Sequence, residues 1–361
     1  MDQTAPWLEL SFDATAEAVD WVRSLLAKTP YTSTLHLTPY LAAERVSDYL
    51  AAERVSDYLA ADRINDQADA SSPWAFTVYL YLPYNSQARS QLDAIAQQLS
   101  PLHRTGLTSE LQTAILNEMP SLNAARHPLA HRVGQRFVVR WLAGAEPASP
   151  DSPIFPASTD DIELNLPPSL AFGSGLHPAT VLSLRLLEHY VQPWMHTLDL
   201  GCGSGILTVA IAKLGAQVLA LDNDAIAVGA TAAAVQQNGV APQVTVRAGS
   251  LGSGSQMGHW MGGDALDDMP ALQPAASFDL IAANILARVH IALAPDFRRA
   301  LRLPDLADRA GHEPGGLLIA AGFTAEYEAD VAAAFVAAGF EAVGGDRLNE
   351  WVALAYRLRA E

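Results

Sequence analysis

The sequence has little cysteine, little positive charge and no long apolar run. Cys202 is the single cysteine among 361 residues, which excludes an intrachain disulfide and a metal cluster held by several thiolates. No apolar stretch is long enough to cross a bilayer, and the first residues, MDQTAPW, do not resemble a signal peptide. We therefore expect a cytoplasmic protein with no membrane partner and no metal.

Charge and composition further limit the class of protein and its binding partners. Lys and Arg number 22 against 39 Asp and Glu, which gives a formal charge of −17. A field of this sign repels nucleic acid and anionic membranes and attracts basic proteins or amines, although acidity that only confers solubility is an equal alternative. Half of the residues are hydrophobic and 17% are charged, so the chain is globular and long enough for two domains.

The stretch from Thr197 to Asp222 carries the clearest pattern, TLDLGCGSGILTVAIAKLGAQVLALD. An apolar run ends at Leu200, a glycine-rich loop and a helical pattern follow, and a second apolar run ends at Asp222. The helical pattern stops at Gly215, a C-terminal glycine signal. Strand, glycine loop, helix, strand and acid together predict the first βαβ unit of a nucleotide-binding sheet.

The spacing of the glycines separates two classes of cofactor. A dinucleotide fingerprint, G-x-G-x-x-G, needs a glycine at position 206, where this chain has Ile206. The chain has D-x-G-x-G-x-G instead, the pattern of methyltransferases that use S-adenosylmethionine (SAM). Asp222 lies where a carboxylate accepts both ribose hydroxyls of an adenosine. The predicted cofactor residues of this unit are Asp199, Gly201, Gly203, Gly205 and Asp222. An ordinary tight turn in an unrelated α/β sheet is the alternative.

Before this unit, alternating and helical periodicities predict a small ferredoxin-like α+β domain, residues 1–112. The expected order is strand 7–12, helix 15–27, strand 32–38, strand 74–82, helix 87–99 and strand 103–111. A tandem nonapeptide, LAAERVSDY at 41–49 and 50–58 with a variant at 59–67, interrupts this domain. We interpret the repeat as an exposed helical arm, with a partner-binding helix as the alternative.

Residues 113–165 are predicted to form a linker region, and 166–361 a seven-stranded, doubly wound, Rossmann-like α/β domain. The linker contains a strand at 135–142 and a segment rich in Pro, Ser and Asp at 143–161. The expected later elements are strands at 244–248, 278–286 and 316–323, helices at 224–238, 289–301 and 324–338, and a hairpin of strands 340–348 and 351–358. The Gly-rich segment 251–277 is predicted to be a surface loop.

Further candidate site residues come from two places. Asn284 ends a predicted strand, where its amide is suited to orienting an amine, although a strand-end Asn also caps helices. LAFGSGLHPAT (170–180) precedes a helix, and its backbone amides together with the Thr180 hydroxyl suit a loop that closes over a ligand. Phe172 and Gly173 join the predicted cofactor residues. His177 is a weaker candidate for a base or a contact to the methionine end, since a lone loop His is more often structural.

AFGSGLHPAT, LDLGCGSGILTVAIAKLGA, ALDND and ANIL, in this order, resemble the bacterial methyltransferases of large-subunit ribosomal protein eleven. The resemblance covers roughly 166–358 and implies that Thr180, Gly201, Asp222 and Asn284 bind cofactor. It also implies trimethylation of lysine side chains and of an N-terminal amine, with the substrate captured by the small N-terminal domain. The family usually has a D-W-x-x-x-W segment where this chain has TAILNEMPSLNAARHPL (113–129), without tryptophan.

The leading hypothesis is a SAM-dependent class I protein N-methyltransferase that acts on a basic ribosomal protein. Another protein or a small amine as acceptor, and a SAM-binding assembly factor without turnover, are the alternatives. An NAD oxidoreductase is disfavoured by the glycine spacing.

Overall fold

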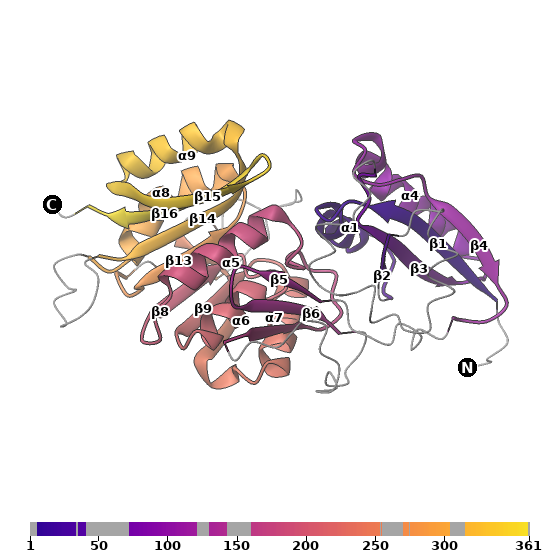
Figure 1. Cartoon of the computed structure of the whole chain (residues 1–361), viewed down its shortest axis with the longest axis horizontal. Helices are drawn as coiled ribbons and strands as arrows, with labels where there is room; N and C mark the ends of the chain where they lie inside the picture. The colour runs from indigo at the N-terminus through magenta and orange to yellow at the C-terminus, as the bar shows by residue number, and fades with distance from the viewer. Residues whose placement is uncertain are drawn as a thin grey trace. The chain divides into compact units, whose positions relative to one another are not determined.

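A computed structural model of the chain describes residues 6–33, 35–40, 72–120, 130–142, 160–252, 254, 270–273, 275–303 and 315–359. The chain divides into two compact units (Figure 1). The first comprises Met1–Arg132, Val138–Asp161 and Pro167–His177, and the second comprises Val133–Phe137, Ile162–Leu166 and Pro178–Glu361. The domain boundaries at 112 and 166 remain a prediction from the sequence.

The first unit contains an antiparallel sheet of four strands in the order β2-β3-β1-β4. Its elements are β1 (Trp7–Ala14), α1 (Ala18–Leu26), β2 (His36–Pro39), β3 (Phe76–Pro83), α4 (Ala88–Arg104) and β4 (Gln112–Leu116). Every second side chain of β1 is buried, and these apolar residues share one core with those of α1 and α4. The strand order confirms the predicted ferredoxin-like arrangement.

The predicted strand at 103–111 is wrong. Helix α4 continues past Leu99 to Arg104, with Pro101 in its last turn, and Gly106 at φ 75° then reverses the chain. The fourth strand is β4, which pairs with β1 so that Trp7 lies opposite Leu116. Residues 103–111 have no alternating pattern of their own, and the helix is decided by the packing of Leu99 and Leu102 into the core.

The second unit is built on a sheet of seven strands in the order β10-β9-β8-β13-β14-β16-β15. The strands are β8 (His196–Leu200), β9 (Gln217–Asp222), β10 (Val244–Ala248), β13 (Leu280–Asn284), β14 (Leu317–Thr324), β15 (Phe340–Leu348) and β16 (Trp351–Leu358). The first five in this order are parallel, and β16 is antiparallel to both of its neighbours. The predicted seven-stranded, doubly wound sheet and its terminal hairpin are confirmed.

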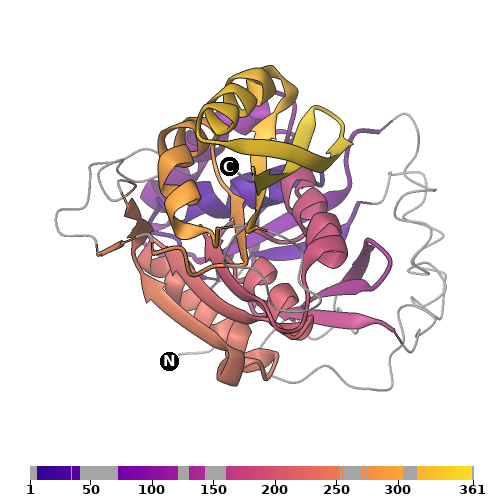
Figure 2. The ribbon, with the colours of Figure 1, turned by 90° about the vertical axis from the view of Figure 1, so that its left-hand side faces the viewer.

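Helices cover both faces of this sheet (Figure 2). They are α5 (Pro178–Tyr190), α6 (Ile206–Lys213), α7 (Ala225–Gln237), α8 (Ala287–Ala300) and α9 (Ala325–Ala337). Helix α6 packs against α5 and α7, and α8 packs against α9. Because β8, β9 and β13 are parallel neighbours, their carboxyl ends bring the glycine loop, Asp222 and Asn284 to one edge of the sheet.

Between the main sheets in sequence lies a three-stranded sheet, β5 (Ala130–Val133), β6 (Phe137–Trp141) and β7 (Ile162–Leu166). The sequence predicted only the middle strand. A short parallel pair, β11 (Ser250–Leu251) with β12 (Ala271–Leu272), begins and ends the segment predicted to be a surface loop. The rest of that segment lies mostly outside the described residues, as does the tandem repeat at 41–67. Within the described part of the chain, no helix combines the length and hydropathy that a membrane crossing requires.

Candidate cofactor and methyl-acceptor site

The glycine loop between β8 and α6 adopts backbone angles that favour glycine. Gly201, Gly203 and Gly205 have φ of 80°, 55° and 83°. A Cβ on Gly205 would lie 2.8 Å from the Cα of Thr231, so helix α7 leaves no room for a side chain there. Thr231 also donates a hydrogen bond from Oγ1 to the carbonyl of Gly203 at 3.0 Å. Helix α7 therefore packs against the glycine loop and fixes its conformation at the end of the sheet.

Asp222 ends β9 and binds this loop directly. Its Oδ2 accepts a hydrogen bond from the backbone N of Gly203 at 3.0 Å, and its Oδ1 accepts one from the backbone N of Asp224, also at 3.0 Å. Only 6% of the residue is exposed. These two bonds fix the orientation of the Asp222 carboxylate at the carboxyl end of β9.

Asp199 lies behind the loop with no exposed surface. Its Oδ2 accepts a hydrogen bond from Thr208 Oγ1 at 2.5 Å, whereas Oδ1 has no hydrogen-bond partner among the residues that the structure describes. Burial, with a smaller contribution from the charge of Asp222, raises the pKa of Asp199 to about 7. A buried acceptor without a donor is costly, so this oxygen is a natural partner for a positively charged ligand group.

Cys202, inside the loop, is buried. Burial raises its pKa well above the ordinary value, and the nearby Asp222 and Asp199 charges act in the same direction. A protonated thiol is a poor nucleophile. Cys202 is therefore a small buried residue of the loop and not a suitable nucleophile.

Asn284 and Thr180 come together at the end of β13. The Nδ2 group of Asn284 donates to Oγ1 of Thr180 at 3.3 Å. Thr180 is fully buried in the first turn of α5, which begins at Pro178. Since Nδ2 is engaged, the amide has its Oδ1 oxygen available as an acceptor for an incoming N–H group.

The segment from Phe172 to His177 belongs to the first unit and is held there by α1. The Oδ1 atom of Asp20, a residue with no exposed surface, accepts hydrogen bonds from the backbone N of Gly173 at 3.2 Å and of Ser174 at 2.7 Å. The Trp21 ring lies edge-on to the rings of Phe172 and His177. The amide of Gly173, a predicted cofactor contact, is thus already bonded within the first unit.

His177 is 1% exposed, and its Nε2 lies 3.7 Å from Oε1 of Glu17. Burial lowers its pKa to about 3. A group with so low a pKa is a poor proton acceptor at neutral pH, which disfavours the role of general base.

The structure shows two further supports of this segment that the sequence did not predict. The Nε2 of His131 donates to the carbonyl of Gly175 at 2.8 Å, and the Nε1 of Trp141 donates to the carbonyl of Ser174 at 2.8 Å. The two donor rings are stacked 5.2 Å apart. No local pattern marks such residues, because the partners are more than 30 positions apart in the chain.

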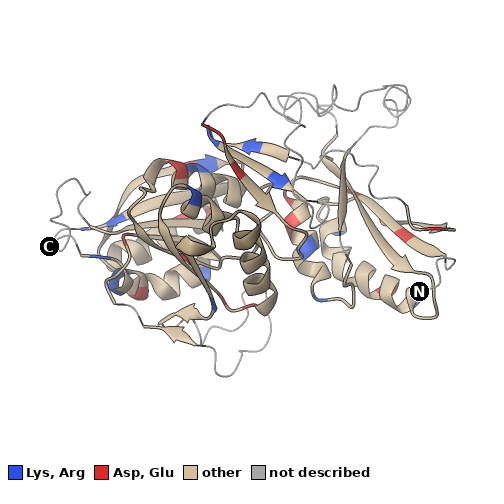
Figure 3. Cartoon of the chain, turned by 90° about the horizontal axis from the view of Figure 1, so that it is seen from below, with Lys and Arg blue, Asp and Glu red and all other residues tan. Residues whose placement is uncertain are grey.

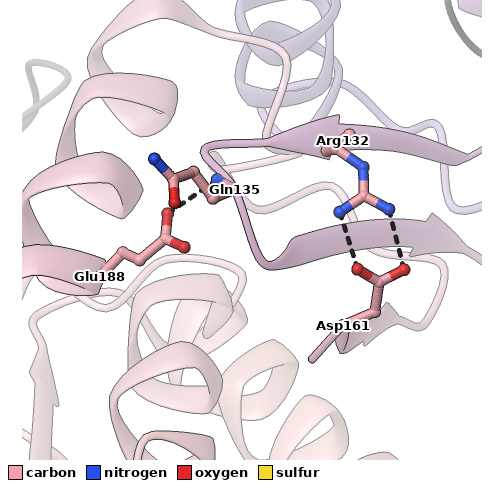
Figure 4. A network of polar contacts seen from close by, with 4 residues as sticks. All are labelled: Arg132, Gln135, Asp161 and Glu188. Atoms are coloured by element: carbon pink, nitrogen blue, oxygen red, sulfur yellow. Dashed lines mark hydrogen bonds and ion pairs between the residues drawn. The ribbon is translucent and has the colours of Figure 1, made fainter. Parts of the chain in front are cut away.

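The hairpin that carries His131 is fastened by polar contacts (Figure 4). Arg132 donates from both terminal nitrogens to the two carboxylate oxygens of Asp161, each at 2.8 Å. At the turn, the backbone N of Gln135 donates to Glu188 Oε2 at 3.0 Å. A bidentate guanidinium–carboxylate pair fixes orientation as well as distance.

We expect Asp20→Leu to lower the free energy of unfolding by about 2–4 kcal/mol, because two buried backbone N–H groups lose their acceptor. Amide hydrogen exchange at Gly173 and Ser174 should accelerate at the same time. Asp20→Asn keeps an oxygen at the Oδ1 position and should retain most of the protection. Equal losses in both variants would show that the charge, and not the acceptor, holds the segment.

The sheet order, the D-x-G-x-G-x-G loop between β8 and α6, and the acid at the end of β9 define a class I SAM-dependent methyltransferase. In the described residues, no group of three or more His, Cys, Asp or Glu side chains is arranged to hold a metal ion.

Comparison with known proteins gives the family. The model of the family described as Ribosomal protein L11 methyltransferase (PrmA) matches residues 6–359. A protein of that name from Chloroflexus aurantiacus is 39% identical over 98% of this chain and 99% of its own length. One from Herpetosiphon aurantiacus is 38% identical over 97% and 98%. The chain belongs to the ribosomal protein L11 methyltransferase family.

A crystal structure of ribosomal protein L11 methylase from Lactobacillus delbrueckii covers 64% of this chain and 99% of its own, with 24% identity and a TM-score of 0.47.

Proposed function

We propose that this chain transfers methyl groups from SAM to amines of ribosomal protein L11, namely lysine side chains and the N-terminal amine. The observation that carries the proposal is the similarity to proteins of that name along nearly the whole chain. The predicted site residues at the carboxyl ends of β8, β9 and β13, among them Asp222 and Asn284, support it.

The cofactor side of the proposal rests on three groups of this chain. Asp222 would accept the ribose hydroxyls, the glycine loop would allow the ligand to approach the backbone, and the unpaired Oδ1 of Asp199 would attract the ammonium group. Thr180 is fully buried beside Asn284, and Phe172 and Gly173 complete the set predicted from the sequence. When bound, SAM supplies a methyl group activated by the adjacent sulfonium.

The acceptor side depends on Asn284. Its Oδ1 accepts a hydrogen bond from the substrate amine and turns the nitrogen lone pair toward the methyl group, while Thr180 prevents rotation of the amide. The amine has to arrive without its proton, because a protonated lysine has no lone pair to donate. His177, with a pKa lowered to about 3, does not take this proton at neutral pH, so release to solvent fits the site better.

The partner we propose is a basic protein. The formal charge of −17 supports attraction of a cationic substrate. In Figure 3 the ribbon positions of Lys and Arg (blue) and those of Asp and Glu (red) both occur along the described part of the chain. We therefore propose no direct binding of nucleic acid. Residues 1–112 act as the substrate-recognition domain, 113–165 as the linker region and 166–361 as the catalytic domain, and a ribosomal substrate places the enzyme in the cytoplasm.

Asp199 makes the cofactor proposal testable through protons. With its pKa raised to about 7, Asp199 is largely protonated at pH 6, whereas a bound ammonium favours the carboxylate. We therefore expect SAM binding at pH 6 to release a proton, and affinity to fall by up to about tenfold for each pH unit below 7. Calorimetry in two buffers of different ionisation enthalpy measures the release.

Asp199→Asn is the matched control, since the amide keeps the shape and cannot release a proton. Binding enthalpies that are equal in both buffers for the unmodified protein would contradict the role given to Asp199.

The decisive experiment for the function is mass spectrometry of ribosomal proteins from a strain that lacks this gene, after incubation with the purified chain and SAM. Mass increments of methyl groups on L11 that disappear with Asn284→Ala support both substrate and site. If SAM binds and no ribosomal protein gains mass, the acceptor is another protein or a small amine, or the chain is an assembly factor without turnover. The linker without tryptophan makes this comparison informative.

A further inference from the structure

His290 is a polar residue in an aromatic core. It lies in the first turns of α8 with no exposed surface, and its ring contacts those of Phe297, Phe323 and Phe335 at centroid distances of 6.1, 5.4 and 5.9 Å. An apolar ring would fill this space without the cost of burying two ring nitrogens. A specific hydrogen bond of the His290 ring therefore has to offset this cost.

That bond goes to the strand beside Asn284. Nε2 of His290 donates to the carbonyl oxygen of Ala321 in β14 at 2.9 Å. The same oxygen accepts the backbone N–H of Ile285, the residue after Asn284, at 3.0 Å. Burial lowers the pKa of His290 to about 4, so the ring stays neutral and its single N–H points at Ala321.

A second constraint on the backbone near Asn284 comes from the next residue of β14. Gly322 has φ 90° within a β-bulge between Ala320 and Phe323. A Cβ there would lie 2.6 Å from the carbonyl oxygen of Ile285 and 2.9 Å from Oδ1 of Asn284. Gly322 thus lies close to the side-chain amide that the acceptor site uses, with no room for a side chain between them.

We propose that His290 is a positioning residue for methyl transfer. It holds the Ala321–Gly322 bulge, and the bulge in turn fixes the backbone at Ile285 and the amide of Asn284. The proposal rests on the proposed function through the role of Asn284. The carbonyl oxygen of Ala321 has two lone pairs and accepts both hydrogen bonds, and it thereby joins the first turns of α8 to the end of β13.

The test uses three variants. His290→Leu removes the donor while keeping an apolar side chain, and His290→Gln keeps an N–H donor of similar reach. Phe335→Leu is the matched control, because Phe335 contacts the His290 ring and has no part in the bond to Ala321. Each is assayed for kcat, for SAM affinity and for thermal midpoint, at a temperature well below unfolding.

We expect His290→Leu to lower kcat by about tenfold or more while SAM affinity changes by less than about threefold, since Asp199 and Asp222, proposed to hold SAM, lie on β8 and β9. His290→Gln should bring kcat back to within about threefold of the unmodified enzyme. Phe335→Leu should lower the thermal midpoint and leave kcat within about twofold. A His290→Leu variant that matches Phe335→Leu in both midpoint and kcat would overturn the proposal, because His290 would then only fill the core.

An NMR readout separates this proposal from the function on which it rests. The side-chain amide signals of Asn284, assigned by their loss in Asn284→Ala, should shift in His290→Leu and stay in place in Phe335→Leu. If these signals shift although the unmodified protein transfers no methyl group, the proposed function is wrong. The positioning of Asn284 by His290 then still holds. Unchanged signals in His290→Leu would overturn the positioning role, whatever the activity.

Discussion

Asp222→Ala is expected to weaken SAM binding by about 100-fold or more. Two charge-assisted hydrogen bonds to the ribose are lost, each worth about 1.5–3 kcal/mol, and about 1.4 kcal/mol corresponds to a tenfold change in affinity. The backbone N–H groups of Gly203 and Asp224 lose their acceptor as well. The glycine loop then keeps only its backbone hydrogen bonds to the Leu221 carbonyl of β9. Isothermal titration calorimetry with SAM measures the change.

Asp224→Ala is the matched control for this result. Asp224 lies two residues beyond the end of β9, and its side chain caps α7 by accepting from the backbone N of Ile226 at 2.8 Å. Its removal should cost about 1 kcal/mol of stability and leave SAM affinity within about threefold. If Asp222→Ala binds SAM as tightly as Asp224→Ala does, the ribose role of Asp222 is wrong.

Asn284→Ala is expected to lower kcat by about 100-fold while SAM affinity changes by less than about threefold. The amide acts on the acceptor amine, and its loss leaves that amine bound without a fixed lone-pair direction. Single-turnover methyl transfer with saturating SAM isolates the chemical step. Thr180→Val keeps Asn284 and removes the hydrogen-bond partner of its Nδ2, so it should give an intermediate loss.

Asn238→Ala provides the control for a generic loss of an asparagine. Asn238 ends α7 and donates from its amide to the carbonyl of Asn165 at 2.7 Å. This variant should lose stability and keep kcat. A loss of SAM affinity in Asn284→Ala as large as the loss of kcat would assign Asn284 to the cofactor rather than to the acceptor.

The sequence predicted the second unit well because its elements have strong periodicity and clear ends. The apolar run before Asp222 and the closing hairpin 340–358 are unambiguous, and parallel strands with intervening helices leave few alternatives for their order. In the first unit, the strand predicted at 103–111 failed because α4 runs through Pro101 to Arg104. Short polar strands such as β5 carry too little pattern to be distinguished from a loop.

For the candidate site, the sequence predicted the residues but not the contacts that orient them. Motif spacing named the residues that would face ligands, such as Asp222 and Asn284. It could not name the contacts that orient them, because Asp20 with Ser174, or His290 with Ala321, join positions that are 154 and 31 residues apart. Such pairs depend on tertiary packing, and no local propensity records it.

The order of strands in the large sheet has a consequence for how the enzyme is made. Strands β8, β9 and β10 are consecutive in the chain, so the half of the sheet that carries the glycine loop and Asp222 can assemble once residue 248 has been synthesised. Strand β13 joins β8 only later, and β16, the final strand, inserts between β14 and β15. A nascent chain therefore completes its cofactor half first, and the surroundings that hold Asn284 are finished only near the end of translation.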